Sequence, residues 1–379
     1  MVWSFVHSAR EMVVGAGSAA RAAEAARREG RRRPVLVLDP WFQGRPPAEA
    51  LAAALREACG TEPVVCAGPP GEPDLDAVAA VQRVFAENAP DVVAVLGGGS
   101  AMDTAKVARM LAANPGPAAA LAGPAGVRMA PHPSLFIALP TTAGTGSEVS
   151  ESAVITAPGE TYKMIFRSPE MTPHLVLLDP ELAASAPPAV TAASGLDAVT
   201  HAVEAFWSRA ANPITDMLAR EAMRLLAAGL PAAHAEGGDL GAREQCLVGS
   251  SLAAMAFNSA HLGLAHAISG ALGALHHTGH GVANALALPH VAAFNAEAAP
   301  EKAAEVARIF GGESAAAALF RLRARLGLDL GLDAVVPPSS LDAVAEAAMR
   351  SGQIRVNPRA VTLAELRAML ERMRLPSEG

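Results

Sequence analysis

The sequence predicts two domains: an α/β domain built on a parallel sheet, followed by an all-helical domain. In the first half of the chain, short β-rich runs alternate with longer Ala-rich helical stretches, which is typical of a parallel sheet covered by helices. After about Pro188 the strand-like runs stop, and Ala- and Leu-rich segments with helical periodicity follow one another. The length of 379 residues is enough for two domains with large cores.

Six short apolar runs are predicted as the strands of the sheet. Several of them end in Gly, Pro or Asp, and in an open α/β sheet ligands bind beyond the carboxyl ends of the strands. The loops that follow the strands are therefore the first candidates for a binding site. The predicted strands are Glu11–Val14, Pro34–Leu38, Pro63–Ala67, Val92–Leu96, Leu135–Leu139 and Leu175–Leu178.

The boundary between the two domains is predicted at Ser185–Val190, which gives an α/β domain over 1–186 and a helical domain over 187–379. The apolar stretch Ser251–Leu275 is interrupted by two histidines and is rich in Gly and Ala, so close helix packing in a buried bundle is predicted rather than a membrane span. The helices predicted in this domain include Ala198–Arg209, Pro213–Ala228, Glu244–Asn258 and Leu341–Met349.

Composition excludes several classes of protein. The formal net charge of −7 gives no basic surface for nucleic acid, and the one dense basic run, Arg27–Arg33, is expected to be the solvated end of a helix. The three cysteines fit a reducing compartment. No signal peptide is predicted in Met1–Arg10, so a cytoplasmic protein is expected.

Two glycine-rich turns compete as the nucleotide site. Gly97–Ser100 follows a buried strand and opens a helix, where close backbone approach and free N–H groups suit a pyrophosphate. Ser100 and Asp103 are expected to form a pair like a capping box, and Asp103 is a candidate cofactor-binding residue, with a simple helix cap as the alternative. Gly15–Ala20 also follows a strand and resembles a dinucleotide fingerprint, but a simple tight turn explains it equally well.

Asp39 bears on the choice of cofactor because it ends a predicted strand. A carboxylate at this place accepts hydrogen bonds from a ribose 2′-hydroxyl and repels a 2′-phosphate, so NAD is favoured over NADP. The alternative is that the Asp-Pro sequence only forms a turn.

A metal site is suggested by one aspartate and three histidines. Asp197 and His201 are spaced i and i+4, on one face of a predicted helix, although such a pair can also be a surface hydrogen bond. His266 lies in an apolar helical run, where a buried imidazole needs a partner or a metal, and His280 follows a Gly-rich stretch. Together they make a plausible ligand set for Fe²⁺ or Zn²⁺.

With these motifs in place, the sequence resembles the iron-containing (group III) alcohol dehydrogenase family, collinearly from about residue 10 to 370. The resemblance implies a dinucleotide-binding domain and a helical domain with NAD(P) and a metal held in a cleft between them. It also implies a homodimer or higher homo-oligomer. The motifs that carry it are Gly97–Lys106, Pro140–Glu148, Gly195–Glu204 and His266–His290.

Carried over position by position, the resemblance gives candidate site residues and one departure. Many members have a histidine four residues after the third metal ligand, where this chain has Gly270. His276 and His277 are candidates to replace it near the active site, with solvated loop imidazoles as the alternative. The other positions implied are the metal ligands Asp197, His201, His266 and His280, and the cofactor contacts Asp39, Gly98, Gly99, Ser100, Thr141, Thr142, Ser152 and Lys163.

The predicted activity is reversible hydride transfer between NAD(H) and a primary alcohol/aldehyde pair, assisted by a metal that polarises the substrate oxygen. Three alternatives stay open: a lyase like dehydroquinate synthase, an enzyme like maleylacetate reductase, and a protein in which the metal is purely structural. The resemblance to the alcohol dehydrogenases favours hydride transfer over these three alternatives. It also leaves Gly15 and Gly17 as turn glycines.

Overall fold

The computed structural model describes residues 8–123, 127–157 and 163–375. Seven of the ten residues in Met1–Arg10, for which no signal peptide was predicted, therefore lie outside the described residues. The chain divides into two compact units. We call them the sheet unit, which comprises His7–Thr142 and Gly146–Ser185, and the helical unit, which comprises Ala143–Thr145 and the chain from Ala186 onward. The short segment Ala143–Thr145 thus groups with helices that follow it much later in the sequence.

The sheet unit contains a six-stranded parallel sheet in the order β1-β8-β5-β4-β2-β3. Its central strands read as continuous Val, Leu and Ile runs because both faces are buried, as expected of a parallel sheet. All six predicted strands are confirmed, and their ends move by one residue at most. The observed strands are β1 (Glu11–Val14), β2 (Pro34–Leu38), β3 (Val64–Ala67), β4 (Val92–Gly97), β5 (Leu135–Pro140) and β8 (Leu175–Leu178).

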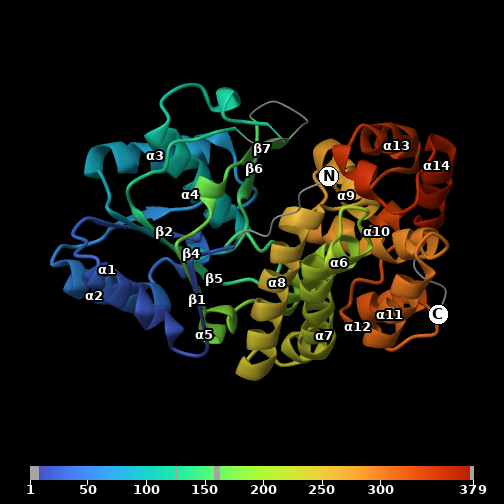
Figure 1. Cartoon of the computed structure of the whole chain (residues 1–379), viewed down its shortest axis with the longest axis horizontal. Coiled ribbons are helices and arrows are strands. Elements are labelled where there is room, and N and C mark those ends of the chain that lie inside the picture. The colour runs from blue at the N-terminus through green and yellow to red at the C-terminus, as the bar shows by residue number, and fades with distance from the viewer. Residues whose placement is uncertain (1–7, 124–126, 158–162, 376–379) are drawn as a thin grey trace. The chain divides into compact units, whose positions relative to one another are not determined.

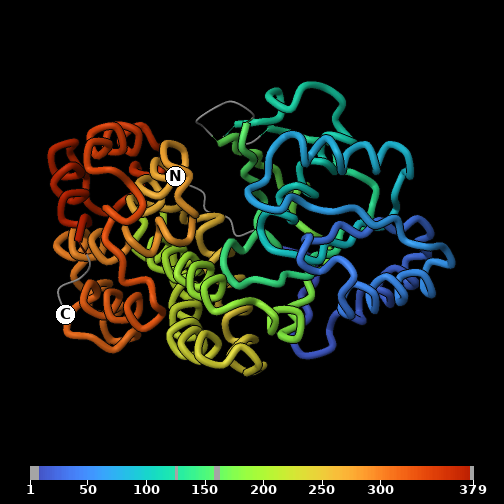
Figure 2. Tube along the Cα trace, turned by 180° about the vertical axis from the view of Figure 1, so that it is seen from behind, coloured from blue at the N-terminus to red at the C-terminus, as the bar shows by residue number. Residues whose placement is uncertain are grey.

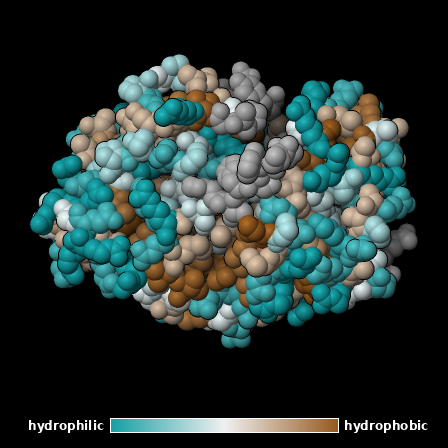
Figure 3. Space-filling view, viewed as in Figure 1, coloured by the Kyte–Doolittle hydropathy of each residue, from teal (hydrophilic) through white to brown (hydrophobic). Residues whose placement is uncertain are grey.

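Four helices cover this sheet. In Figure 1, α1 (Arg21–Arg28) and α2 (Pro46–Cys59) lie on one face and α3 (Leu75–Asn88) and α4 (Gly99–Ala113) on the other. The alanines of α1 are buried while Arg27 and Arg28 point outward to pair with exposed glutamates. The hydrophilic surface over α1 and α2 in Figure 3 agrees with the prediction that this basic run is a solvated face.

A second, two-stranded sheet is formed by β6 (Ser152–Thr156) and β7 (Lys163–Arg167), and it was not predicted from the sequence. Both strands alternate: one side, with Ile155 and Phe166, is buried, while Val154 and Ile165 on the other side are over a third exposed. A period of two is therefore present in the sequence, but each run begins and ends with a polar residue. Runs that are not continuously apolar are easily taken for loop.

The helical unit is built around α6, which is buried over most of its length. Packed against it are α7, α8 and α10, and the later helices, orange to red in Figure 2, gather beside α9 and α10. Helix α6 begins at Pro188 rather than at the predicted Ala198. The helices are α5 (Pro180–Ala183, in the sheet unit), α6 (Pro188–Trp207), α7 (Pro213–Ala235), α8 (Leu240–Ala260), α9 (Leu264–His276), α10 (His280–Asn295), α11 (Pro300–Phe310), α12 (Ala315–Arg325), α13 (Leu341–Met349) and α14 (Leu363–Arg372).

The apolar stretch Ser251–Leu275 is not one helix, because the chain breaks it at His261–Gly263 between α8 and α9. His261 has a φ of 60°, which ends the first helix, and α9 then starts in a new direction. Among the described residues, no helix is both long and apolar enough to cross a bilayer.

Two glycines let helices approach α6 closely. A side chain at Gly195 would collide with Leu230 of α7, and one at Gly281 would collide with the backbone carbonyl of Ala193. Gly195 therefore permits the close packing of α6 against α7, and Gly281 permits the contact that brings the start of α10 against the first half of α6. That contact places His280, the first residue of α10, near the side chains of α6.

Candidate functional site

Four side chains of the helical unit converge on one point. Asp197 and His201 come from α6, His266 from α9 and His280 from α10, and one ligand atom from each lies within 4.8 Å of all the others. The histidine Nε2 atoms are 3.8, 3.8 and 3.6 Å from Asp197 Oδ1 for His201, His266 and His280. A tetrahedral metal with bonds of about 2.1 Å holds its ligand atoms about 3.4 Å apart, so the cluster is close to that size.

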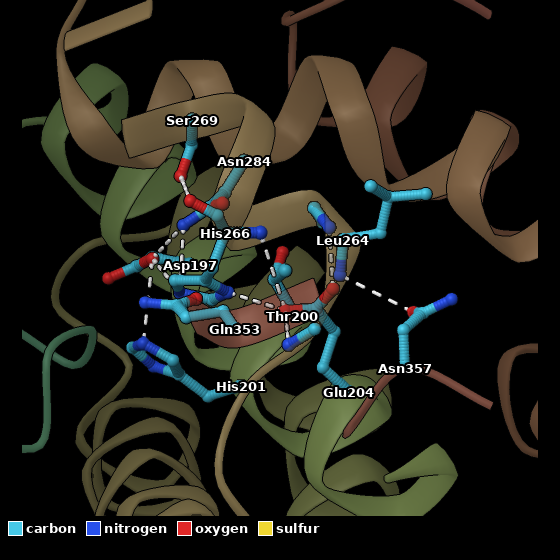
Figure 4. Close-up of polar contacts among 12 residues, drawn as sticks. Asp197, Thr200, His201, Glu204, Leu264, His266, Ser269, Asn284, Gln353 and Asn357 are labelled. Carbon is cyan, nitrogen blue, oxygen red and sulfur yellow. Dashed lines mark hydrogen bonds and ion pairs between the residues drawn. The ribbon is translucent and has the colours of Figure 1, made fainter. Parts of the chain in front are cut away.

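A buried carboxylate sets the orientation of His266. Glu204 accepts hydrogen bonds from His266 Nδ1 at 2.7 Å and from the backbone N–H groups of Gly263 and Ala265 at 2.9 and 2.6 Å (Figure 4). It thereby caps the start of α9 and holds the imidazole proton on Nδ1, so that the Nε2 lone pair faces the cluster. Glu204 is the last residue of the motif Gly195–Glu204, but no role was predicted for it from the sequence. The signal that could have indicated one is its spacing of one helical turn after His201.

Two further contacts arrange the other ligands. His201 Nδ1 lies 3.2 Å from the carbonyl oxygen of Gly144, to which it can donate, leaving Nε2 free. Asn284, one turn after His280 on α10, donates from Nδ2 to Asp197 Oδ1 at 2.6 Å. Like Glu204, Asn284 belongs to a sequence motif, His266–His290, and no role was predicted for it.

The electrostatics of the cluster favour a cation. Burial acts to raise the pKa of Asp197, but the three imidazoles and the Asn284 amide outweigh it and lower the pKa overall. Burial lowers the pKa of His201 to about 4, so this imidazole is neutral at pH 7. The cluster combines one carboxylate with three imidazoles, and such a donor set fits Fe²⁺ or Zn²⁺.

The four ligand side chains differ in exposure. Those of Asp197, His201 and His266 are 3 to 5% exposed, whereas the side chain of His280 is 40% exposed. A small ligand can therefore reach the cluster from the His280 side. A site with one open side is typical of catalytic rather than structural metal centres.

The predicted nucleotide loop lies in the sheet unit at the end of β4. Helix α4 begins at Gly99, with Gly98 at its N-cap and no side chain capping it, so the N–H groups of its first turn are available to an anion. A Cβ at Gly97 would come within 2.9 Å of Asp39 Cβ, and one at Gly98 within 3.0 Å of Thr142 Oγ1. The fold thus brings Asp39 and Thr142 to the glycine loop, as the sequence analysis expected of cofactor contacts.

The capping pair predicted between Ser100 and Asp103 is wrong. Asp103 instead accepts hydrogen bonds from Ser147 Oγ at 2.6 Å and from the N–H of Val154 at 2.8 Å. Burial raises its pKa, with Lys106 and these hydrogen bonds acting the other way. The carboxylate therefore ties α4 to β6, which favours the structural alternative for this residue, and the helix start is left open because Gly98 carries no side chain.

The remaining cofactor candidates lie in different settings. The N–H of Thr141 is bonded to the carbonyl of Gly97 at 3.2 Å, which places it beside the loop. Ser152 begins β6, and its carbonyl oxygen accepts from Lys106 Nζ at 3.0 Å. Lys163 forms an ion pair with Glu72 at 2.9 Å. Their predicted contacts with cofactor stay predictions.

The backbone N–H groups of the other glycine-rich turn, Gly15–Ala20, already donate to a protein side chain. Asp179 accepts from the N–H of Gly17 at 3.2 Å and from that of Ala19 at 2.9 Å, which uses the donors that a phosphate would need. Gly15 and Gly17 both have positive φ, at 130° and 75°. They are turn glycines, as the sequence analysis inferred from the family resemblance.

The candidates to replace the missing histidine lie at the end of α9. His277 is exposed and has a φ of 54°, and the buried Nε2 of His276 has no hydrogen-bond partner among the described residues. A Cβ at Gly270 would meet nothing within 4 Å. The space that a side chain would fill at this position is therefore open.

Comparison with known families matches both parts of the chain. Residues 9–180 match the family described as iron-containing alcohol dehydrogenase, and residues 191–374 match the C-terminal domain of the Fe-containing alcohol dehydrogenase family. The 1,3-propanediol dehydrogenase of Klebsiella pneumoniae is 39% identical over 328 residues, which is 83% of this chain and 84% of that protein.

Solved structures agree over nearly the whole length. The alcohol dehydrogenase from Oenococcus oeni superimposes with a TM-score of 0.92 at 32% identity, covering 98% of this chain and 100% of that one. The sulfoacetaldehyde reductase from Bifidobacterium kashiwanohense, determined in complex with NAD⁺, has a TM-score of 0.89 at 30% identity, covering 99% of both chains.

Proposed function

The chain belongs to the iron-containing alcohol dehydrogenase family, and on this premise we propose that it interconverts a primary alcohol and its aldehyde by hydride transfer with NAD(H) at a centre holding one divalent metal ion. The observation that carries the proposal is the convergence of Asp197, His201, His266 and His280 within 4.8 Å. Fe²⁺ is the first choice of metal, since the family is described by iron, and Zn²⁺ fits the same ligands.

In this proposal each residue of the cluster has a defined task. Asp197 Oδ1 and the Nε2 atoms of the three histidines hold the ion, which supplies Lewis-acid stabilisation of negative charge on the substrate oxygen. Glu204 keeps His266 in the tautomer that can bind. The partly exposed His280 marks the side from which substrate enters, and the open space at Gly270 admits a substituent there.

NAD(H) is proposed as the hydride donor and acceptor. The open N-terminus of α4 would hold the pyrophosphate, and Gly98 and Gly99 allow its close approach. Asp39 would accept hydrogen bonds from the ribose hydroxyls while its Oδ1 also accepts the N–H of Trp41 at 2.9 Å. The NAD⁺ complex of a structural neighbour supports this cofactor. We also propose that the enzyme works in the cytoplasm as a homodimer or higher homo-oligomer.

The proposal is tested by removing ligands singly. We expect Asp197→Ala and His280→Ala each to lower aldehyde-dependent NADH oxidation at least about 1000-fold, because charge stabilisation of the reacting oxygen is lost. His234→Ala, in α7 and outside the cluster, is the matched control and should keep activity and metal. Bound metal is measured by elemental analysis of freshly purified protein, and activity on a panel of short, hydroxylated and acidic aldehydes.

Full activity with retained metal in both ligand variants would refute the assignment of the site. Metal binding by the wild-type protein without NADH oxidation on any aldehyde would instead leave the metal site standing and point to the lyase alternative.

A further inference from the structure

Asn284 lies against three of the four proposed metal ligands. Its side chain is fully buried, and its Nδ2 atom is 2.6 Å from Asp197 Oδ1 and 3.1 Å from His266 Nε2 (Figure 4). The same atom is 3.3 Å from His280 Nε2. These are the atoms that would bind the ion. The amide nitrogen of Asn284 thus makes its contacts with the ligand atoms themselves, unlike Glu204, which contacts His266 on the opposite ring nitrogen.

The direction of these contacts follows from the neighbouring groups. Because Glu204 holds the proton of His266 on Nδ1, the Nε2 atom is an acceptor. Asp197 Oδ1 is also an acceptor, so the amide presents its NH₂ group, which carries two donors, to the ligand atoms. The Oδ1 atom of Asn284 is buried and has no hydrogen-bond partner among the described residues, so nothing else in the protein fixes the amide in the opposite orientation.

We propose that Asn284 is a positioning residue that takes the place of the cation in the metal-free enzyme, holding Asp197 and His266 together through its two amide hydrogens. This inference rests on the proposed metal site. In the metal-free state the amide donates to the buried Asp197 carboxylate and to the buried Nε2 atom of His266. Once an ion binds, the Nε2 lone pairs are engaged, and only the contact with Asp197 stays compatible. Asn284 therefore stabilises the metal-free state more than the loaded state.

Two other roles make different predictions. If Asn284 only fills space in the core, its removal lowers the stability of both states equally. If the amide rotates in the loaded enzyme and its Oδ1 becomes a metal ligand, removal lowers the stability of the loaded state more. The difference between the two losses of stability therefore distinguishes the three roles.

The experiment compares thermal unfolding of the full chain with Zn²⁺ and after removal of metal by a chelator. The variants are Asn284→Leu, which keeps the volume, and Asn284→Ala. The matched control is Asn295→Leu, because Asn295 is similarly buried on the same helix, and its side chain bonds, among the residues that the structure describes, to Asn357 alone. We expect both Asn284 variants to lower the Tm of the metal-free form by roughly 3–8 °C and that of the Zn²⁺ form by clearly less. The control should lower both forms alike.

Every outcome bears on the inference. An Asn284→Leu protein that folds only when Zn²⁺ is present supports it, and equal losses in the two forms of the Ala variant overturn it. A larger loss in the Zn²⁺ form also overturns it. So does a changed visible spectrum of the Co²⁺-substituted Ala variant, because that spectrum reports the ligands of the ion. A wild-type protein whose Tm does not respond to Zn²⁺ would instead contradict the proposed metal site itself.

Discussion

Two groups of charged side chains, one in each unit, are partnered in opposite ways. In the sheet unit, Lys106 is fully buried, and its ammonium group donates to the carbonyl oxygens of Ser150 and Ser152 at 2.9 and 3.0 Å. Arg109, three residues further along α4, donates to several neutral oxygens, including the carbonyl of Glu170 at 3.0 Å. In the helical unit, Asp197 lies among three imidazoles, and within the described part of the chain no ammonium or guanidinium acts on it.

The difference separates structural charge from functional charge. Burial lowers the pKa of Lys106 to about 8 and that of Arg109 to about 10, but the protein supplies oxygens to both groups, and they hold loops and strands to α4. Asn284 supplies only one amide group as a hydrogen-bond donor to Asp197 and the imidazoles around it. A buried charge whose partners are complete indicates structure, whereas a buried group of acceptors without a cation indicates a ligand.

The largest expected effect on stability comes from removing the buried ammonium group of Lys106, whose hydrogen-bond acceptors are all supplied by the protein. We expect Lys106→Met to lower the free energy of unfolding by about 3–5 kcal/mol, because two carbonyl oxygens lose their donor and the nearby Asp103, Glu148 and Glu151 lose a counter-charge. Urea unfolding measures the loss, and elemental analysis should show that the metal content is unchanged. Loss of the metal from a folded variant would break the distinction between the two units.

A smaller effect is expected from the carboxylate behind His266. Glu204→Gln should weaken binding of Zn²⁺ about 10- to 100-fold, because the imidazole loses the acceptor that fixes its tautomer. The competition of the protein with a chelator for Zn²⁺ measures this affinity. Glu221→Gln, an exposed glutamate paired with Arg224 on α7, is the control and should leave the affinity unchanged. If Glu204→Gln binds Zn²⁺ as tightly as the wild type, orientation of His266 does not depend on this carboxylate.

A third effect should appear with pH in the sheet unit. Burial, helped by Arg109, lowers the pKa of His174 to about 4 from its ordinary value of 6.5. Between these values the unfolded chain binds a proton that the folded chain does not, so stability falls as the pH drops from 6.5 towards 4. From pH 7 to pH 5 the loss from this residue is about 1–2 kcal/mol.

The matched variant is His174→Asn, which does not titrate. Its amide oxygen can still accept the N–H of Phe136, a bond now made by Nδ1 at 2.9 Å. Urea unfolding at both pH values should show a shallower pH dependence for the variant. An unchanged dependence would mean that His174 is not held neutral in the folded state.

The smallest expected effect concerns Asp39, a carboxylate in the sheet unit that we assign to a ligand. Asp39→Gly should improve the ratio of kcat/KM with NADPH to that with NADH roughly fivefold, because repulsion of a 2′-phosphate is removed. Steady-state assays with one aldehyde and both cofactors measure the ratio. A constant ratio would mean that Asp39 serves only the turn in which it caps the N–H of Trp41.

How much the sequence could predict depended on whether the signal was local. The six strands of the large sheet were found because each is a continuous apolar run ended by Gly, Pro or Asp, and the i, i+4 pair Asp197 and His201 follows directly from helical geometry. The β6–β7 hairpin was missed because its runs, SAVIT and KMIFR, have polar residues at both ends and are not continuously apolar. The convergence of His266 and His280 on α6 was implied by the family resemblance and not by spacing alone.

The contacts that sequence reasoning could not supply are long-range. Asp103 was expected to cap its own helix, but Ser147 and Val154, which are more than forty residues away, take its oxygens. The roles of Glu204 and Asn284 likewise depend on residues over sixty positions distant, brought together by tertiary packing. Patterns within one helix do not contain that information.

The central claim is that the four converging side chains form one site for a divalent cation. Its most direct test is the metal stoichiometry of the full chain after equilibrium dialysis against Zn²⁺, comparing the wild type with Asp197→Asn, which keeps the size of the side chain and removes its charge. We predict about one ion per chain for the wild type and almost none for the variant. Equal stoichiometry in the two proteins, with both folded, would contradict the claim.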